Sequence, residues 1–168
     1  AIHGVPPAIA LLRDPQSSLT LRIGLIRALN SMVIDPFRYT YSHDPSPEET
    51  PEVTATWATW WERAKDEFPE IAPDRRRKLA ARLEALAAET SRSNLFEEIE
   101  EFQRDDMRLF AERLLGDSPL REKVVASLGL RLYIGKPLRM DVPRDADQEM
   151  VDRVAENWGA FFDLHKDE

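Results

Sequence analysis

The sequence of 168 residues predicts an all-α protein built as a short stack of about seven helices with two long inserted loops. Two observations carry this prediction. Apolar residues recur three and four positions apart along the predicted helices, whereas strand-like alternation is confined to one short run. In addition, segments near the N-terminus return about a hundred residues later in the same order, and such a repeat is typical of stacked helical units.

The repeat consists of three matched segments, each separated from its copy by 99 to 103 residues. The pairs are Leu11-Leu12-Arg13-Asp14-Pro15 with Leu114-Leu115-Gly116-Asp117-Ser118, Leu21-Arg22 with Leu120-Arg121, and Trp57-x-x-Trp60-Trp61 with Trp158-x-x-Phe161-Phe162. The common order and the small drift in spacing indicate an internal duplication over about residues 8–68 and 107–165. We expect it to lie within a single α-helical domain, residues 1–168, large enough for a stable core.

The first two predicted helices form an antiparallel hairpin. Pro6-Pro7 suits the first turn of a helix that ends at Asp14-Pro15. Ser18 then caps a second helix that runs to about Val33. Its apolar residues share one face, as expected of an amphipathic helix. They are Leu21, Leu25, Ala28, Leu29 and Met32.

A long loop and an aromatic helix follow the hairpin. Between Asp35 and Pro51, four prolines and the cluster Ser42-His43-Asp44 oppose regular structure, and loops of this length in compact domains are often functional. Thr50-Pro51 then begins a helix that Pro69 ends. Its apolar side chains follow helical spacing and are Trp57, Trp60, Trp61, Ala64 and Phe68.

Three more helices follow. Pro73 begins one with a leucine stripe, because proline suits a first helical turn. Asn94 and Glu97 have the spacing of a capping box for the next, which continues to Leu114 with a kink near Asp105-Asp106. Ser118-Pro119 then begins the second copy of the hairpin helix, which extends to about Leu132.

The second loop begins at Gly135-Lys136-Pro137 and ends near Asp145. The spacing from Asp145 to Gln148 again matches a capping box, here for the last helix. The alternating residues 130–134 resemble a short strand, but they directly continue a helix and have no obvious strand partner. We therefore expect them to be helical.

The composition excludes several classes of site and partner. The absence of cysteine excludes disulfides, thiolate metal sites and cysteine nucleophiles. The net charge of −8 opposes binding to DNA or RNA, and no apolar run is long enough to span a membrane. We therefore expect a soluble protein without a nucleic-acid partner, either cytoplasmic or, if the absent initial Met reflects signal cleavage, exported.

The two loops carry charges of opposite sign. Residues 35–52 contain five acids and one base, a net charge of −4, whereas residues 130–144 contain four bases and one acid, a net charge of +3. Equivalent loops of a duplicated unit are expected on one side of a stack, where such charges suit docking to a protein. Loop tyrosines add interface anchors. The predicted partner-binding residues are Tyr39, Tyr41, Asp44, Glu48, Glu49, Arg131, Tyr133, Lys136 and Arg139. Ordinary solvated loops are the alternative.

Other conspicuous residues are interpreted as structural. The stripe of tryptophans around Trp60 predicts core packing, with at most one indole edge exposed. His43 has no second histidine nearby and so lacks the ligand pattern usual in metal sites built from His and carboxylates. We therefore expect it to belong to a solvated acidic loop. Residues 75–78 are basic and are expected to pair with the acids of residues 97–101 or to be solvated. No Ser-His-Asp arrangement, Gly-rich phosphate loop or His-Glu-x-x-His motif is present, so the sequence predicts no catalytic residue, cofactor or metal.

The helical hairpins at residues 8–32 and 107–132 resemble HEAT repeats. Each has an Asp at the turn and an Arg in the second helix, namely Asp14 with Arg22 and Asp117 with Arg121. The resemblance implies a short right-handed HEAT-like α-solenoid in which the Asp and the Arg support neighbouring turns. HEAT-like solenoids mostly serve as binding surfaces and scaffolds.

These observations predict a protein–protein interaction module without enzymatic activity, a scaffold or accessory subunit of a larger assembly. That assembly is either soluble or membrane-bound. Two alternatives remain open. One is a HEAT-like enzyme, such as a DNA glycosylase or a bilin lyase, and the other is a terminal domain of a longer repeat protein. The sequence identifies neither the partner nor the oligomeric state.

Overall fold

The computed structural model describes residues 5–32, 38–42, 44–89 and 95–166. Over these ranges the chain forms eight α-helices and three short 3₁₀ turns and contains no strand, as expected for an all-α protein. The residues group into two compact units. Unit 1 comprises residues 1–37 and 138–168, and unit 2 comprises residues 38–137.

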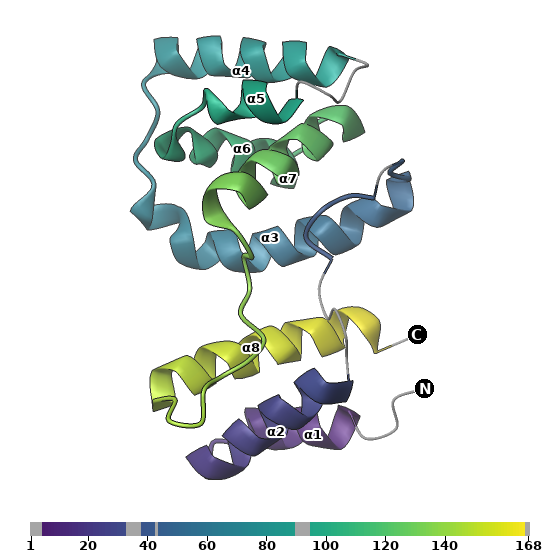
Figure 1. The fold of residues 1–168 in the computed structure, drawn as a ribbon, viewed down its shortest axis with the longest axis vertical. Coiled ribbons are helices and arrows are strands. Elements are labelled where there is room, and N and C mark those ends of the chain that lie inside the picture. Colours follow the sequence, from purple (N-terminus) through teal and green to yellow (C-terminus); the bar gives the residue numbers. More distant parts are fainter. Residues whose placement is uncertain (1–4, 33–37, 43, 90–94, 167–168) are drawn as a thin grey trace. The chain divides into compact units, whose positions relative to one another are not determined.

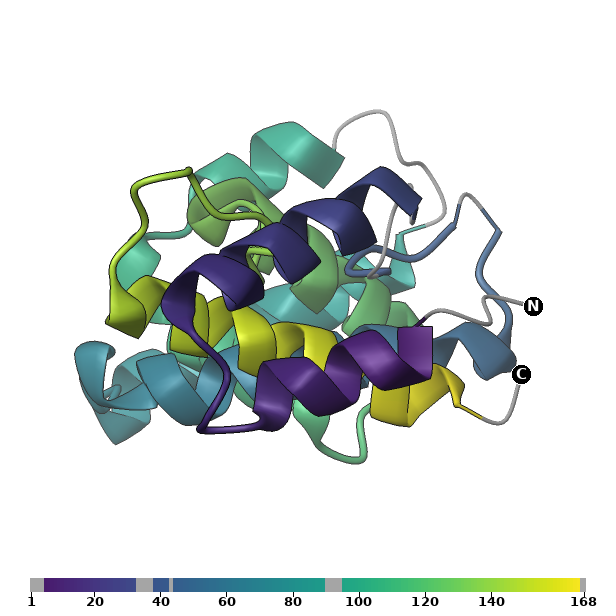
Figure 2. The same ribbon diagram turned by 90° about the horizontal axis from the view of Figure 1, so that it is seen from below.

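Unit 1 is a three-helix assembly drawn from the two ends of the chain. Its helices are α1 (Val5–Arg13), α2 (Leu19–Met32) and α8 (Gln148–His165). The hairpin of α1 and α2 packs against α8, which contacts both of its helices. Figures 1 and 2 show the purple and dark-blue hairpin lying along the yellow helix. Its buried side chains come from all three helices and include Ile9 of α1, Leu29 of α2 and Trp158 of α8, which is completely buried.

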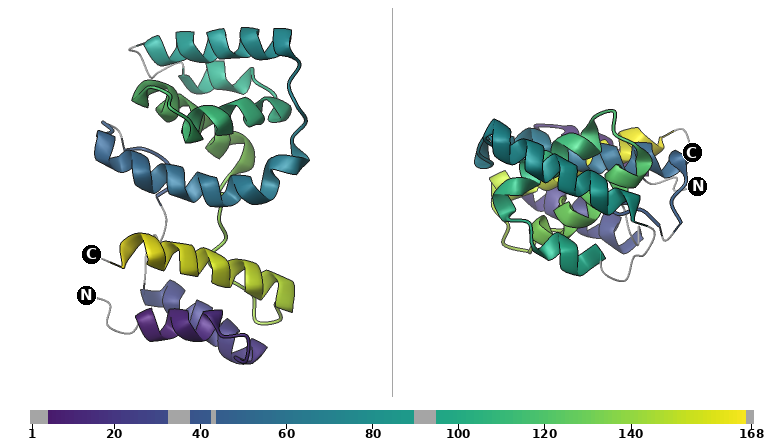
Figure 3. Two further views of the ribbon diagram at one scale, coloured as in Figure 1. Left: turned by 180° about the vertical axis from the view of Figure 1, so that it is seen from behind. Right: turned by 90° about the horizontal axis from the view of Figure 1, so that it is seen from above.

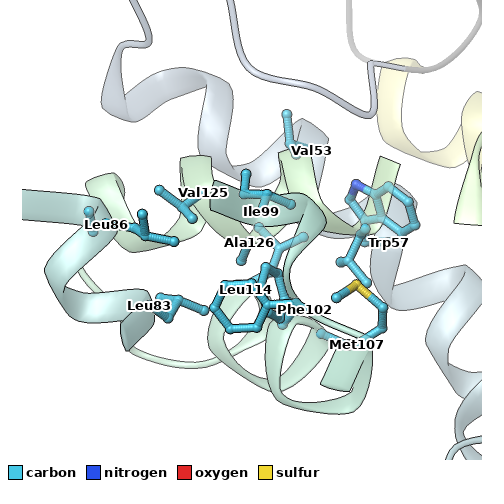
Figure 4. Close-up of a cluster of buried hydrophobic side chains, with 14 of the residues drawn as sticks. Val53, Trp57, Leu83, Leu86, Ile99, Phe102, Met107, Leu114, Val125 and Ala126 are labelled. Atoms are coloured by element: carbon cyan, nitrogen blue, oxygen red, sulfur yellow. The ribbon is translucent and has the colours of Figure 1, made fainter. Parts of the chain in front are cut away.

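Unit 2 contains the other helices. They are η1 (Pro47–Glu49), α3 (Thr50–Ala64), η2 (Lys65–Glu67), α4 (Pro73–Ala88), α5 (Leu95–Glu100), η3 (Arg104–Asp106), α6 (Met107–Leu115) and α7 (Leu120–Ile134). In the hairpin of α6 and α7, α3 contacts α6, α5 contacts α7, and α4 contacts both helices. The left view of Figure 3 shows α4 and α3 on opposite sides of this hairpin. Figure 4 shows the shared core, which includes Trp57, Leu83, Ile99, Met107 and Val125.

Each unit combines a hairpin from one copy of the repeat with the third helix of the other copy. The sequence match relates α1 and α2 to α6 and α7, and it relates α3 to α8. In the structure, however, α8 packs on α1 and α2, whereas α3 packs on α6. The helices that the sequence match places in one group, such as α1, α2 and α3, are therefore divided between the two units.

Several predicted helix ends are confirmed. The hydroxyl of Ser18 accepts a hydrogen bond from the backbone of Leu21 at 3.2 Å, as expected for a cap. Helices α3 and α4 begin at Thr50 and Pro73, as expected. The run at residues 130–134 is helical and ends at Gly135, whose φ of 79° favours glycine.

Two predicted boundaries are wrong. The helix expected to continue to Leu114 with a kink near Asp105-Asp106 is completely divided there into α5 and α6, because Asp106 accepts a hydrogen bond from the backbone N–H of Gln103 at 2.8 Å and forms a separate turn. The cap of α8 is Asp147 rather than Asp145, since its carboxylate accepts from the backbone of Met150 at 2.8 Å. Asn94, the expected cap of the divided helix, lies outside the described residues.

Of the apolar face predicted for the second helix, only Leu29 is buried. Ile26 and most of Arg22, which lie outside the predicted face, are buried as well. By contrast, 43% of Leu21 and 50% of Met32 are exposed to solvent. Helix α2 therefore packs into unit 1 through one side of its apolar surface and leaves the other side uncovered.

Candidate functional site

A hydrogen-bonded anchor holds the first loop against α3. The indole N–H of Trp57 donates to the carbonyl oxygen of Tyr39 at 2.8 Å, and the hydroxyl of Thr56 donates to the carbonyl oxygen of Arg38 at 3.1 Å. Because Trp57 is completely buried, its N–H needs a protein partner. The tryptophan thus fixes the backbone of the loop, in agreement with its predicted structural role.

The same anchor recurs in unit 1. The indole N–H of Trp158 donates to the carbonyl oxygen of Met140 at 2.8 Å, and the side-chain amide of Asn157 donates to that of Arg139 at 2.7 Å. All four residues stand 101 positions after their counterparts in unit 2. Sequence reasoning matched the tryptophans but missed these backbone contacts. The repetition of Pro36-x-Arg38 as Pro137-x-Arg139, at the same offset, is the signal that marks them.

Two of the predicted partner-binding residues are buried in the first loop. The carboxylate of Glu49 accepts hydrogen bonds from Arg38 and from Ser42, each at 2.9 Å, and only 9% of Glu49 is exposed. Tyr41 is equally buried. Burial, reinforced by the negative charge of Glu49, raises the pKa of Tyr41. These side chains therefore stabilise the loop from within.

The other two predicted tyrosines also have structural contacts. The Arg131 guanidinium lies 5.8 Å from the centre of the Tyr39 ring, a cation–π distance. The hydroxyl of Tyr133 donates to backbone carbonyls at the end of α5, including that of Glu100 at 2.9 Å. Burial, followed by the charges of Glu100 and Asp106, raises the pKa of Tyr133. Both tyrosines are half-buried.

Four predicted residues remain available to a partner. Asp44, Glu48, Lys136 and Arg139 are exposed and form no ion pair within the described part of the chain. The first three belong to unit 2, whereas Arg139 belongs to unit 1. The charged groups of the two loops are thus divided between the units.

Most other arginines are neutralised within their unit. Arg75 pairs with buried Asp106 at 2.7 Å, Arg76 with Glu112, and Arg77 with Asp74. The basic start of α4 is therefore paired internally, as expected. The predicted partners were wrong, because the acids of residues 97–101 that form ion pairs contact Arg82, one turn further along the helix.

The ion pairs of unit 1 border a cavity of about 490 Å³ beside α8. Arg22 donates to the carbonyl oxygen of Leu12 at 3.2 Å and pairs with Asp152 at 2.5 Å. Hydrogen bonds from Arg22 and Arg13 lower the pKa values of Asp152 and Asp163, respectively. Each charged group in these two pairs is therefore already neutralised by its partner.

The cavity in unit 2 has a volume of about 340 Å³ and lies at the N-terminal end of α7. Its lining combines the charged residues Asp44, Glu89 and Arg121 with the apolar residues Pro45, Leu86, Ala87, Leu95, Leu120, Val124 and Val125. Arg121 is exposed there, whereas its repeat counterpart Arg22 is largely buried. The two arginines that the sequence match relates therefore differ in environment.

No group of three metal-binding side chains occurs among the described residues, and His43 lies outside them. None of the helices described is both long and apolar enough to cross a membrane. Comparison with known proteins finds no matching family model, no similar curated protein and no similar solved structure.

Proposed function

We propose that this chain is a protein–protein interaction module, a scaffold or accessory subunit of a larger assembly, and that it has no enzymatic activity of its own. It binds its partner through charged loops carried by HEAT-like helical pairs. A surface of this kind recognises a protein by charge and shape and requires no cofactor.

The observation that supports this proposal is the combination of anchored loop backbones with unpaired loop charges. The carbonyl groups of Tyr39 and Met140 are each fixed by a buried tryptophan. Nearby, Asp44 and Arg139 have exposed side chains without ion-pair partners in the described ranges. A fixed backbone reduces the entropy lost on docking, while unpaired charges remain free to attract a partner.

The test is a native pull-down with the whole chain as bait at low and high salt, with co-eluting proteins identified by mass spectrometry. We expect a stoichiometric partner. Replacing Arg131, Lys136 and Arg139 together with Glu should slow its association and weaken the salt dependence, because long-range attraction falls with the loop charge.

A matched variant carries the same three charge reversals outside the loops, at Lys78, Lys123 and Lys166. It should leave association close to that of the unmodified chain, and circular dichroism should show an unchanged helical content in both variants. Recovery of the chain without a partner at both salt concentrations would contradict the proposal. Equal effects of the two variants would show that net charge, rather than the loops, drives binding.

A further inference from the structure

Helix α2 carries an uncovered apolar stripe whose spacing is that of a helix-packing seam. Leu21, Leu25, Ala28 and Met32 are separated by four, three and four residues, which places them on one side of the helix. Of the side-chain and backbone surface of Leu21 and Met32, 43% and 50% are exposed, and Ala28 is exposed as well. Such a continuous stripe differs from scattered surface leucines and marks a contact surface.

The open side of this stripe permits close approach. A Cβ atom placed on Gly24 would meet no heavy atom within 4 Å, so the backbone there faces open space. With Ala28 one turn further on, the two small residues let a second helix pack near the backbone. This side of α2 therefore allows the close backbone approach of a second helix.

Unit 2 shows what covers the corresponding hairpin helix. There α7 is contacted by α6 within the hairpin and also by α4. The buried stripe of α4 contains Leu83 and Leu86, preceded by Leu79 at the same four–three spacing. In unit 1 the partners of α2 are α1 and α8, and no described helix takes the place of α4. A leucine-bearing amphipathic helix is therefore the complement that α2 lacks.

The charge around α2 indicates which residues should flank the apolar stripe of that partner helix. Residues 5–32 contain three arginines and one aspartate in a chain whose net charge is −8. Arg27 is exposed and has no ion-pair partner among the described residues. Helix α2 itself contains no acid, so a second copy would place arginine against arginine. Carboxylates beside the apolar stripe of the occupant would instead pair with Arg27.

We infer that α2 docks an amphipathic helix of a partner protein, with a leucine and alanine stripe flanked by acidic residues. This inference rests on the proposed function and specifies one element of the partner. It concerns a helical face that is separate from the charged loops.

Two synthetic 18-residue peptides provide the probe. Both carry the same leucine and alanine stripe, one with glutamate flanks and the other with lysine flanks. Binding to the whole chain is measured by fluorescence anisotropy and by amide chemical shifts. We expect the glutamate peptide to bind more tightly and to shift the amides of Gly24 and Ala28. The variant L21Q/M32Q should bind the glutamate peptide about tenfold more weakly, because apolar area is removed from the contact.

The matched control is F96Q/L132Q, which replaces two comparably exposed apolar residues of unit 2 and should preserve peptide binding. Equal affinity for both peptides, shifts confined to other helices, or dimerisation through α2 in sedimentation experiments would each overturn the inference. The pull-down separates the two proposals. A stoichiometric partner retained by L21Q/M32Q would overturn docking on α2 and leave the proposed function intact, whereas no partner would contradict the function.

Discussion

Replacing Trp158 with Ala is expected to unfold unit 1 and leave unit 2 folded. Trp158 is completely buried and fixes Met140 through its indole N–H. Removing such a side chain costs about 3–5 kcal/mol, a large part of the stability available to a unit of roughly 70 residues. Thermal melting followed by hydrogen exchange should show loss of protection in α1, α2 and α8, with protection retained in α6 and α7.

Two variants accompany this prediction. Trp158→Phe keeps most of the packing but removes the hydrogen bond, and it should cost only about 1–3 kcal/mol. Trp57→Ala removes the corresponding side chain of unit 2 and should reverse the pattern of lost protection. If Trp158→Ala instead destabilises α6 and α7 as much as α1 and α2, the assignment of this side chain to unit 1 is wrong.

Replacing Gly129 with Ala is expected to destabilise unit 2. Here glycine is required by a close approach, because a Cβ atom would overlap the ring of Phe110 on α6. That ring is fully buried and packs edge-to-face on Phe102 at 4.9 Å, which limits its movement. We expect a loss of about 1–3 kcal/mol from overpacking, although alanine favours a helix by about 1 kcal/mol.

Gly24→Ala provides the matched control, since it makes the same change in a helix without a steric clash. It should stabilise the chain by up to about 1 kcal/mol. Urea unfolding monitored by circular dichroism compares the two variants. Equal stabilisation by both would mean that α6 and α7 are further apart than the structure places them.

Local signals were sufficient to predict most helices. Ser18 and Pro73 act on the turn in which they stand, so their effects can be read from a few neighbours. The position of the break between α5 and α6 was predicted as a kink near Asp105-Asp106, but the complete separation of the two helices was not. Besides capping a local turn at Gln103, the carboxylate of Asp106 is held by Arg75 at 2.7 Å from 31 residues away. A contact of that range leaves no periodic trace in the sequence.

The candidate loops were found from composition, but the roles of their residues were not. Glu49 and Glu48 are adjacent acids, yet Glu49 is buried against Arg38 whereas Glu48 faces solvent. Composition counts both as surface charge, because it does not report which way a side chain points. The exposed face of α2 was hidden for the same reason. Helical spacing identifies an apolar stripe but does not show whether another helix covers it.

Cysteine cross-linking tests whether α8 rather than α3 packs on the first hairpin, and it is straightforward because the chain has no cysteine of its own. Arg13 pairs with Asp163 of α8 at 2.5 Å, and the repeat counterpart of Asp163 is Glu62 of α3. In the variant R13C/D163C we predict efficient cross-linking by a short bis-maleimide within one chain. Cross-linking of R13C/E62C in place of R13C/D163C would show that α3 rather than α8 packs on α1, and would contradict this arrangement.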